Sequence, residues 1–119
     1  MNILLAEDDM NFGSILKREL EEGSIFNVDH VFNGVEAVLS FKNGHYDFVL
    51  LDLRMPRLTG TDALRIIRTI NAEVPVITFT GSAGSHERTE SIEAGAIKCL
   101  VKPFVVGELK ETIRSHFLR

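Results

Sequence analysis

The sequence predicts an α/β fold in which a five-stranded parallel sheet carries helices on both faces. Three observations lead to this prediction. Five short apolar runs alternate along the chain with five segments of helical character. The runs are almost continuously apolar, as expected for strands that are covered on both faces. The connections are short, which is typical of strand–helix–strand units built around one sheet.

Each predicted strand is short and is bounded by polar residues. An apolar run alone would fit a buried helix equally well, but runs of this length favour strands. The weakest are the second run, which contains Asp29 and His30, and the fifth, which Lys98 interrupts. We expect strands over residues 3–6, 26–31, 48–51, 76–79 and 96–101.

The segments between the runs repeat apolar residues at helical spacing, as expected for helices that cover a sheet with one face. Asp9 precedes the first helix and is expected to cap it. The fourth, around residues 85–94, is the least convincing because only Ile92 and Ala94 are clear apolar positions. The other four are marked by Phe12, Ile15, Leu16 and Leu20, by Val35, Val38 and Leu39, by Ala63, Ile66, Ile67 and Ile70, and by Leu109, Ile113 and Phe117.

The length of 119 residues predicts a single domain, residues 1–119, of ordinary globular composition. A net charge of -4 argues against direct nucleic-acid binding by this domain, because such binding depends on neutralising phosphates. Cys99 is the only cysteine, which excludes an internal disulfide. We see neither a signal peptide nor an apolar run of the ~18 residues that a membrane span needs, and therefore expect a cytoplasmic protein.

Acidic side chains follow the ends of two predicted strands, at the edge where open parallel sheets bind their ligands. Glu7 and Asp8 follow the first strand, and Asp52 follows the third. In the strand order 2-1-3-4-5 of a doubly wound sheet these strands are neighbours, so the three carboxylates share a small space. Like charges this close demand a counter-ion, and a hard divalent cation such as Mg²⁺ or Mn²⁺ suits oxygen ligands.

The same edge carries further groups suited to phosphoryl transfer. Thr80 ends the fourth strand, and Lys102 follows the fifth. We expect Asp52 to act as a nucleophile that forms an aspartyl phosphate. Lys102 would supply a positive charge and Thr80 a hydroxyl donor for the phosphoryl oxygens. The stretch 81–85 after Thr80 is predicted to be a flexible loop that acts as a mobile switch.

Taken together, the segments at the strand ends resemble the receiver domains of two-component response regulators over essentially the whole chain. Each segment is a weak motif alone, but their order and spacing make the set specific. The segments are residues 3–9 (ILLAEDD), 49–56 (VLLDLRMP) with Gly60, 75–81 (PVITFTG), Gly95 with Ala96, and 101–104 (VKPF).

This resemblance implies a flavodoxin-like fold with five parallel strands in the order 2-1-3-4-5 and five helices. It implies phosphorylation at Asp52, catalytic roles for Thr80 and Lys102, and a cis peptide bond between Lys102 and Pro103. The implied ligands of Mg²⁺ or Mn²⁺ are Asp8, Asp52 and the backbone carbonyl of Arg54, with Glu7 in the second shell or acting through water.

The resemblance also implies partners. A sensor histidine kinase or a histidine phosphotransfer protein would donate the phosphoryl group, and an unknown downstream effector would receive the signal. The domain would be a monomer or a weak dimer, and would not be an enzyme beyond catalysing its own phosphorylation and dephosphorylation.

The sequence departs from the family pattern at two places. Cys99 stands where the family usually has Tyr or Phe, which moves with the hydroxyl at the Thr80 position. Thr80 and Cys99 are therefore the expected switch residues, but the small cysteine shifts the expected output toward the loop after Thr80 and the fourth helix. Ile97 and Lys98 replace acids that support a dimer in the family's commonest DNA-binding branch, so that dimer is not expected.

Other functions of similar folds fit less well. A phosphatase or phosphotransferase with an aspartyl nucleophile would want a second acid two residues after Asp52, where Arg54 stands. A flavin-binding module would need a hydroxyl- and glycine-rich loop after the first strand, where three acids would repel phosphate. A receiver that signals without phosphorylation is disfavoured by the complete set of acids, hydroxyl and lysine. Arg54 and Ser82 flank the expected site and are placed to influence phosphoryl lifetime.

Overall fold

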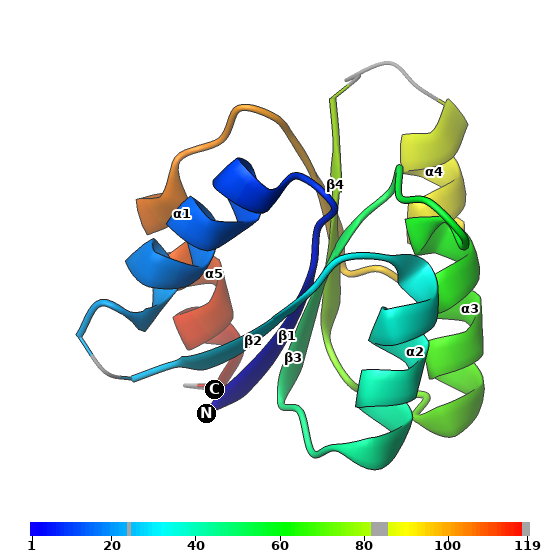
Figure 1. Ribbon diagram of the computed structural model, residues 1–119, viewed down its shortest axis with the longest axis horizontal. Helices are drawn as coiled ribbons and strands as arrows, with labels where there is room; N and C mark the ends of the chain where they lie inside the picture. Colours follow the sequence, from blue (N-terminus) through cyan, green and yellow to red (C-terminus); the bar gives the residue numbers. More distant parts are fainter. Residues whose placement is uncertain (24, 82–85, 118–119) are drawn as a thin grey trace.

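The computed structural model describes residues 1–23, 25–81 and 86–117, and shows a five-stranded parallel sheet with helices on both faces (Figure 1). The strand order is β2-β1-β3-β4-β5, which confirms the predicted topology. The strands are β1 (Asn2–Ala6), β2 (Asn27–Val31), β3 (Phe48–Asp52), β4 (Val76–Thr80) and β5 (Lys98–Val101), and the helices are α1 (Met10–Glu21), α2 (Gly34–Asn43), α3 (Gly60–Ile70), α4 (His86–Glu93) and α5 (Val106–Phe117).

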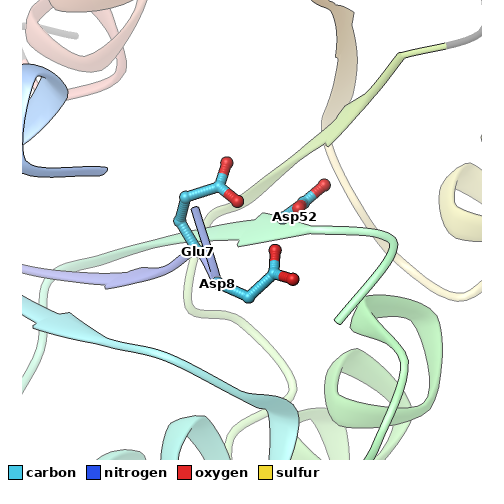
Figure 2. A group of neighbouring side chains, drawn as sticks. All are labelled: Glu7, Asp8 and Asp52. Carbon is cyan, nitrogen blue, oxygen red and sulfur yellow. The ribbon is translucent and has the colours of Figure 1, made fainter. Parts of the chain in front are cut away.

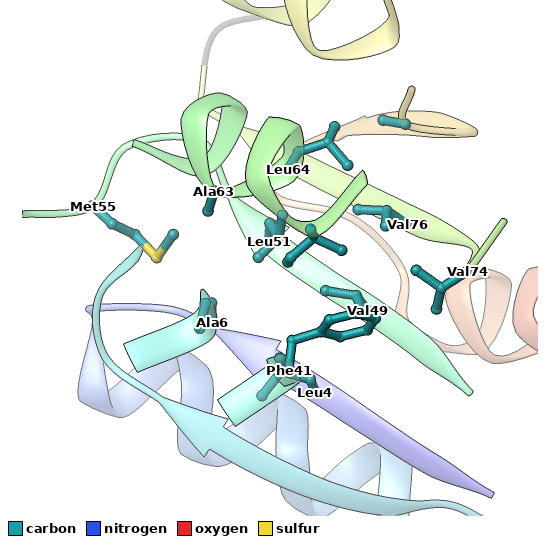
Figure 3. Close-up of a cluster of buried hydrophobic side chains, with 13 residues drawn as sticks. Leu4, Ala6, Phe41, Val49, Leu51, Met55, Ala63, Leu64, Val74 and Val76 are labelled. Atoms are coloured by element: carbon teal, nitrogen blue, oxygen red, sulfur yellow. The ribbon is translucent and has the colours of Figure 1, made fainter. Parts of the chain in front are cut away.

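The sheet divides the core into two layers because successive strand side chains point to opposite faces. In β1, Ile3 and Leu5 pack with α1 and α5, whereas Leu4 and Ala6 pack with α2 and α3. Figure 1 shows α1 and α5 together on one side of the sheet and α2, α3 and α4 on the other. In the layer covered by α2 and α3, Phe41 of α2 packs against the strands (Figure 3). The alternation explains why the central strands are apolar at nearly every position.

Side-chain caps begin three of the helices. Asp9 accepts a hydrogen bond from the backbone N–H of Phe12, which confirms the predicted cap of α1. Asn33 caps α2 and Thr59 caps α3 in the same way. These caps satisfy backbone donors that have no partner within the helix, and they fix where each helix leaves the sheet edge.

The predicted apolar stripes of the helices are only partly correct. Leu16, Leu20, Ala63, Ile67, Leu109 and Ile113 are buried, or nearly so. By contrast, Ile15, Leu39, Ile66, Ile70 and Phe117 are each more than a third exposed, so they lie at the margin of the buried face or beyond it. The face is instead completed by residues that the stripes omitted, such as Gly13, Ala37 and Phe41. Close packing against neighbouring elements sets the rotation of a helix, and the apolar pattern alone does not.

The prediction for the fourth helix was wrong in detail. Ile92, its expected apolar anchor, is 44% exposed, and Ala94 follows the end of α4. Ser91 is the buried side chain, and its hydroxyl is 3.0 Å from that of Thr78 on β4. A buried pair of hydroxyls that hydrogen-bond each other satisfies its polar atoms, so a polar residue can take the inner position.

Each strand differs from the prediction at one boundary: β1 begins one residue earlier, β3 and β4 each end one residue later, and two strands begin later than expected. β2 begins at Asn27 and β5 at Lys98, although Phe26 and Ala96 are both buried. Ser82 and the rest of the expected switch stretch up to residue 85 lie outside the described residues. In the described parts of the chain, none of the helices combines the length and apolar character needed to cross a bilayer.

Candidate functional site

The ends of β1 and β3 bring three carboxylates together, as the sequence predicted. β1 and β3 are hydrogen-bonded neighbours, with Ala6 opposite Leu51. The residues that follow these two positions are therefore side by side. Glu7, Asp8 and Asp52 each offer an oxygen, and the three oxygens lie within 4.8 Å of one another. Figure 2 shows the three carboxylates turned toward a common space.

Burial differs sharply among the three acids. Glu7 is fully buried, Asp52 is 6% exposed, and Asp8 is exposed. Glu7 is held at several points: its carboxylate accepts a hydrogen bond from the backbone N–H of Asp9, and its backbone carbonyl lies 2.8 Å from the His30 ring nitrogen. The cluster therefore has a fixed buried floor and an open side at Asp8.

Lys102 brings a positive charge to this cluster from the end of β5. Its ammonium donates a hydrogen bond of 2.6 Å to Glu7 and lies 3.6 Å from Asp52. It also lies 4.5 Å from the centre of the Phe12 ring, where a cation–π contact adds to its stability. Burial opposes the charge of Lys102, but hydrogen bonding to Glu7 and the charges of both acids outweigh it and raise the pKa of the lysine.

The largest pKa shift among the acids of the site is that of Asp52. Burial, together with the hydrogen bond and negative charge of Glu7, raises the pKa of Asp52 from its ordinary value of 3.8 to about 7. Lys102 and the backbone N–H of Arg54 oppose this rise without cancelling it. One lysine is too little positive charge for three acids, so the site favours a further cation.

The donor set fits a hard divalent cation. The three clustered side chains offer only carboxylate oxygens, the ligands that Mg²⁺ and Mn²⁺ accept, and no histidine or cysteine belongs to the cluster. Asp8 is open to solvent, which suits an ion that keeps several waters. This fit rests on the chemistry of the donors.

The remaining predicted residues lie close by. Thr80 is buried at the end of β4, and its backbone carbonyl accepts a hydrogen bond from the backbone N–H of Lys102. The Lys102–Pro103 bond is cis. Cys99 is 4% exposed and lies opposite Thr78 on β4, so it is a small buried apolar residue. The side chain of Arg54 pairs with Glu87 of α4.

Sequence reasoning missed three participants. Phe12 and His30 contact Lys102 and Glu7 from α1 and β2, and Glu87 binds Arg54 from α4. Each comes from an element that carries none of the strand-end motifs. No local pattern marks these residues, because their roles depend on how distant segments pack.

Known proteins resemble this chain along its length. The family model of the response regulator receiver domain matches residues 3–114. The chain is 36% identical to "Probable transcriptional regulatory protein SilR" of Salmonella typhimurium, and 33% identical to "Transcriptional regulatory protein CusR" of Escherichia coli strain K12, each over all 119 residues. Both alignments cover 52% of the relative, so the chain spans about half the length of the curated relatives it matches.

Solved structures show the same likeness. The receiver domain of the sensor histidine kinase PA1611 from Pseudomonas aeruginosa PAO1 is 32% identical, with a TM-score of 0.85 and coverage of 96% of this chain and 94% of that chain. That structure has a magnesium ion coordinated in its active site cleft. The likeness therefore extends to a protein in which the corresponding fold holds this cation.

Proposed function

Because the chain belongs to the receiver domain family of two-component response regulators, we propose that it is a phosphorylation switch in which Asp52 accepts the phosphoryl group. The observation that carries the proposal is the position of Asp52. It lies at the end of a central strand, between two other acids and Lys102. A buried carboxylate next to a lysine, at the open edge of a parallel sheet, is suited to forming an aspartyl phosphate.

The proposed reaction exchanges one phosphorus bond for another. A carboxylate oxygen of Asp52 attacks the phosphorus of a phosphohistidine, the phosphorus–nitrogen bond breaks, and the donor imidazole leaves with the electron pair. Attack needs the ionised carboxylate, and the raised pKa of Asp52 means that added positive charge promotes that form. Lys102 would then move from Glu7 toward the phosphoryl oxygens, and the Thr80 hydroxyl would donate to another of them.

Asp8, Asp52 and the backbone carbonyl of Arg54 would hold a divalent cation, with Glu7 in the second shell or acting through water. When bound there, Mg²⁺ would supply the positive charge that neutralises the crowded acids and the incoming phosphoryl oxygens. The exposure of Asp8 leaves this side of the site open to the donor.

The signalling role also implies a domain organisation, a phosphoryl donor and an effector. We assign residues 1–119 to one cytoplasmic receiver domain that acts as a monomer or weak dimer. A sensor histidine kinase or phosphotransfer protein is the proposed donor. The domain would catalyse only its own phosphorylation and dephosphorylation. The matched relatives are named as transcriptional regulators and are about twice as long, which supports an effector outside this domain for any contact with DNA.

The test is to incubate the protein with Mg²⁺ and a small acyl phosphate, and to measure its intact mass. We expect one added phosphoryl group that is labile in alkali, and none after chelation of the metal. Asp52→Asn is the matched variant, because it keeps the size of the side chain and removes the nucleophile. Equal phosphorylation of this variant, or no phosphorylation of the wild type under any metal condition, would contradict the proposal.

A further inference from the structure

Arg54 links the expected phosphorylation site to α4 through two different parts of one residue. Its backbone N–H acts on the Asp52 carboxylate and lowers the pKa of that acid. Its guanidinium donates two hydrogen bonds to Glu87, with Nε 3.2 Å from Oε2 and Nη2 3.1 Å from Oε1. Glu87 lies in the first turn of α4. Arg54 is therefore the one residue between Asp52 and a contact that holds α4.

This ion pair crosses a groove of about 360 Å³ between the β3–α3 connection and α4. The Arg54 side chain is 73% exposed and that of Glu87 is 43% exposed, so the pair is bidentate but open to solvent. Exposed ion pairs are weak, typically because water screens them and long side chains lose freedom. The guanidinium can therefore change partner when a stronger anion comes within reach.

The charge on Asp52 already acts on Arg54. Hydrogen bonding and the charge of Glu87 raise the pKa of the arginine, and the Asp52 carboxylate adds to this effect in the same direction. A phosphoryl group would carry a charge of about -1.5 to -2 and three acceptor oxygens at this place. Arginine binds such a group in the same bidentate geometry that it uses for a carboxylate.

α4 depends on polar contacts of this kind. Ser91 is its buried side chain, whereas Ile92 is 44% exposed. A second ion pair joins Glu90 to Arg65 of α3 at 3.5 Å. Because Ser91 is the buried residue of α4, the Arg54–Glu87 pair is one of the few contacts that hold its first turn in the described part of the chain.

We propose that Arg54 is a positioning residue shared by two anions. It binds Glu87 and holds α4 while Asp52 is a free carboxylate, and it turns to the phosphoryl group when Asp52 is phosphorylated. The inference rests on the proposed function of Asp52. By thermodynamic linkage, a contact that phosphorylation breaks must itself oppose phosphorylation. Removing the Glu87 charge therefore makes the phosphorylated form easier to reach.

The test uses beryllofluoride with Mg²⁺ as a stable analogue of the phosphoryl group, with its affinity measured by ¹⁹F NMR or calorimetry. We expect about threefold tighter binding in Glu87→Gln and about threefold weaker binding in Arg54→Gln. Threefold corresponds to about 0.6 kcal/mol, within the range of exposed ion pairs. The double variant is expected to match Arg54→Gln, since Glu87 acts only through the arginine.

Glu90→Gln is the control, because it removes the other acid that ties α4 to its neighbour and leaves Arg54 paired. Its affinity is expected to equal that of the wild type. A merely structural pair would give shifts of the same sign in Glu87→Gln and Arg54→Gln, and a general loosening of α4 would also tighten binding in Glu90→Gln. Either result overturns the inference while leaving the proposed function intact. A wild-type protein that binds no analogue in the presence of Mg²⁺ overturns both.

Discussion

Replacing Asp52 with Asn is expected to stabilise the protein when divalent metal is chelated and the pH is above neutrality. Burial and the neighbouring Glu7 raise the pKa of Asp52 to about 7, from an ordinary value of 3.8. Each pKa unit corresponds to 1.36 kcal/mol, so keeping this carboxylate ionised opposes folding by up to about 4 kcal/mol. Water entry and small side-chain movements reduce that figure, and we expect a gain of about 1–3 kcal/mol in the free energy of unfolding at pH 8.5.

The sign follows from proton binding. Between pH 4 and 7 the folded state binds the Asp52 proton more tightly than the unfolded state, so the free energy of unfolding falls as pH rises through this range. Asparagine has no such proton, and the gap between variant and wild type should open from about pH 4 and reach its full size above pH 8.

The assay is urea unfolding in EDTA at several pH values, followed by circular dichroism. Glu93→Gln, which removes an exposed carboxylate from α4, is the control and should show no such gap. Adding Mg²⁺ should stabilise the wild type by about 1.4 kcal/mol when it exceeds its Kd tenfold, and should stabilise Asp52→Asn less. A variant that is less stable than the wild type at pH 8.5 without metal would refute the electrostatic reasoning.

Three further predictions concern contacts away from the acidic cluster. Tyr46 is the only tyrosine and the chain has no tryptophan, so its absorbance near 295 nm reports one group. Burial and a hydrogen bond to Asp29 raise its pKa to about 12. Asp29→Asn removes the charged partner but not the burial, so the midpoint should fall and stay above 10, and the stability linked to Tyr46 should be complete below pH 10 and lost as pH rises through 12. An unchanged midpoint in that variant would contradict the assigned contact. Arg68 donates to the backbone carbonyls of two connections that follow α3 and α4, so Arg68→Ala should lower the free energy of unfolding by about 2–4 kcal/mol in urea titrations, and a loss below 1 kcal/mol would argue against this. Lys110 donates to two carbonyls at the end of α1, and Lys110→Met should lower it by about 1–2 kcal/mol with no change in the urea m-value.

The parallel sheet and the acids at its strand ends could be predicted from local patterns in the sequence, and the family resemblance implied the strand order. A short apolar run followed by an acid marks a strand and its carboxyl end, and the parallel sheet then gathers those ends. Glu7, Asp8 and Asp52 meet because β1 and β3 are neighbours, and the strand order alone requires that. Lys102 follows β5 at the same edge of the sheet and reaches the acids from there.

The rotation of the helices and the partners of the site could not be predicted in this way. On α1, Gly13 faces the His30 ring so closely that a side chain there would collide with it, and Ile15 is 48% exposed. His30 in turn contacts the backbone of Glu7. Such contacts join residues far apart in the chain, and each depends on shapes that only the packed structure defines.

The expected effect of Cys99, at the position where the family usually has an aromatic residue, depends on which contacts hold α4. In a receiver whose switch depends on a large ring moving inward, the signal is a change in apolar packing. Here the residue opposite Thr78 is a small buried thiol, and the Thr78 hydroxyl pairs with Ser91 beneath α4. The exposed ion pairs of Glu87 with Arg54 and of Glu90 with Arg65 also hold α4. Exposed ion pairs are weak, so the charge that one phosphoryl group adds is enough to change them. A receiver built in this way would transmit phosphorylation through charge, so its response should weaken as salt rises, whereas a packing switch would be insensitive to salt.

Amide exchange of α4 with and without beryllofluoride, at low and high ionic strength, distinguishes the two: an equal response at both would show that packing, and not charge, carries the signal.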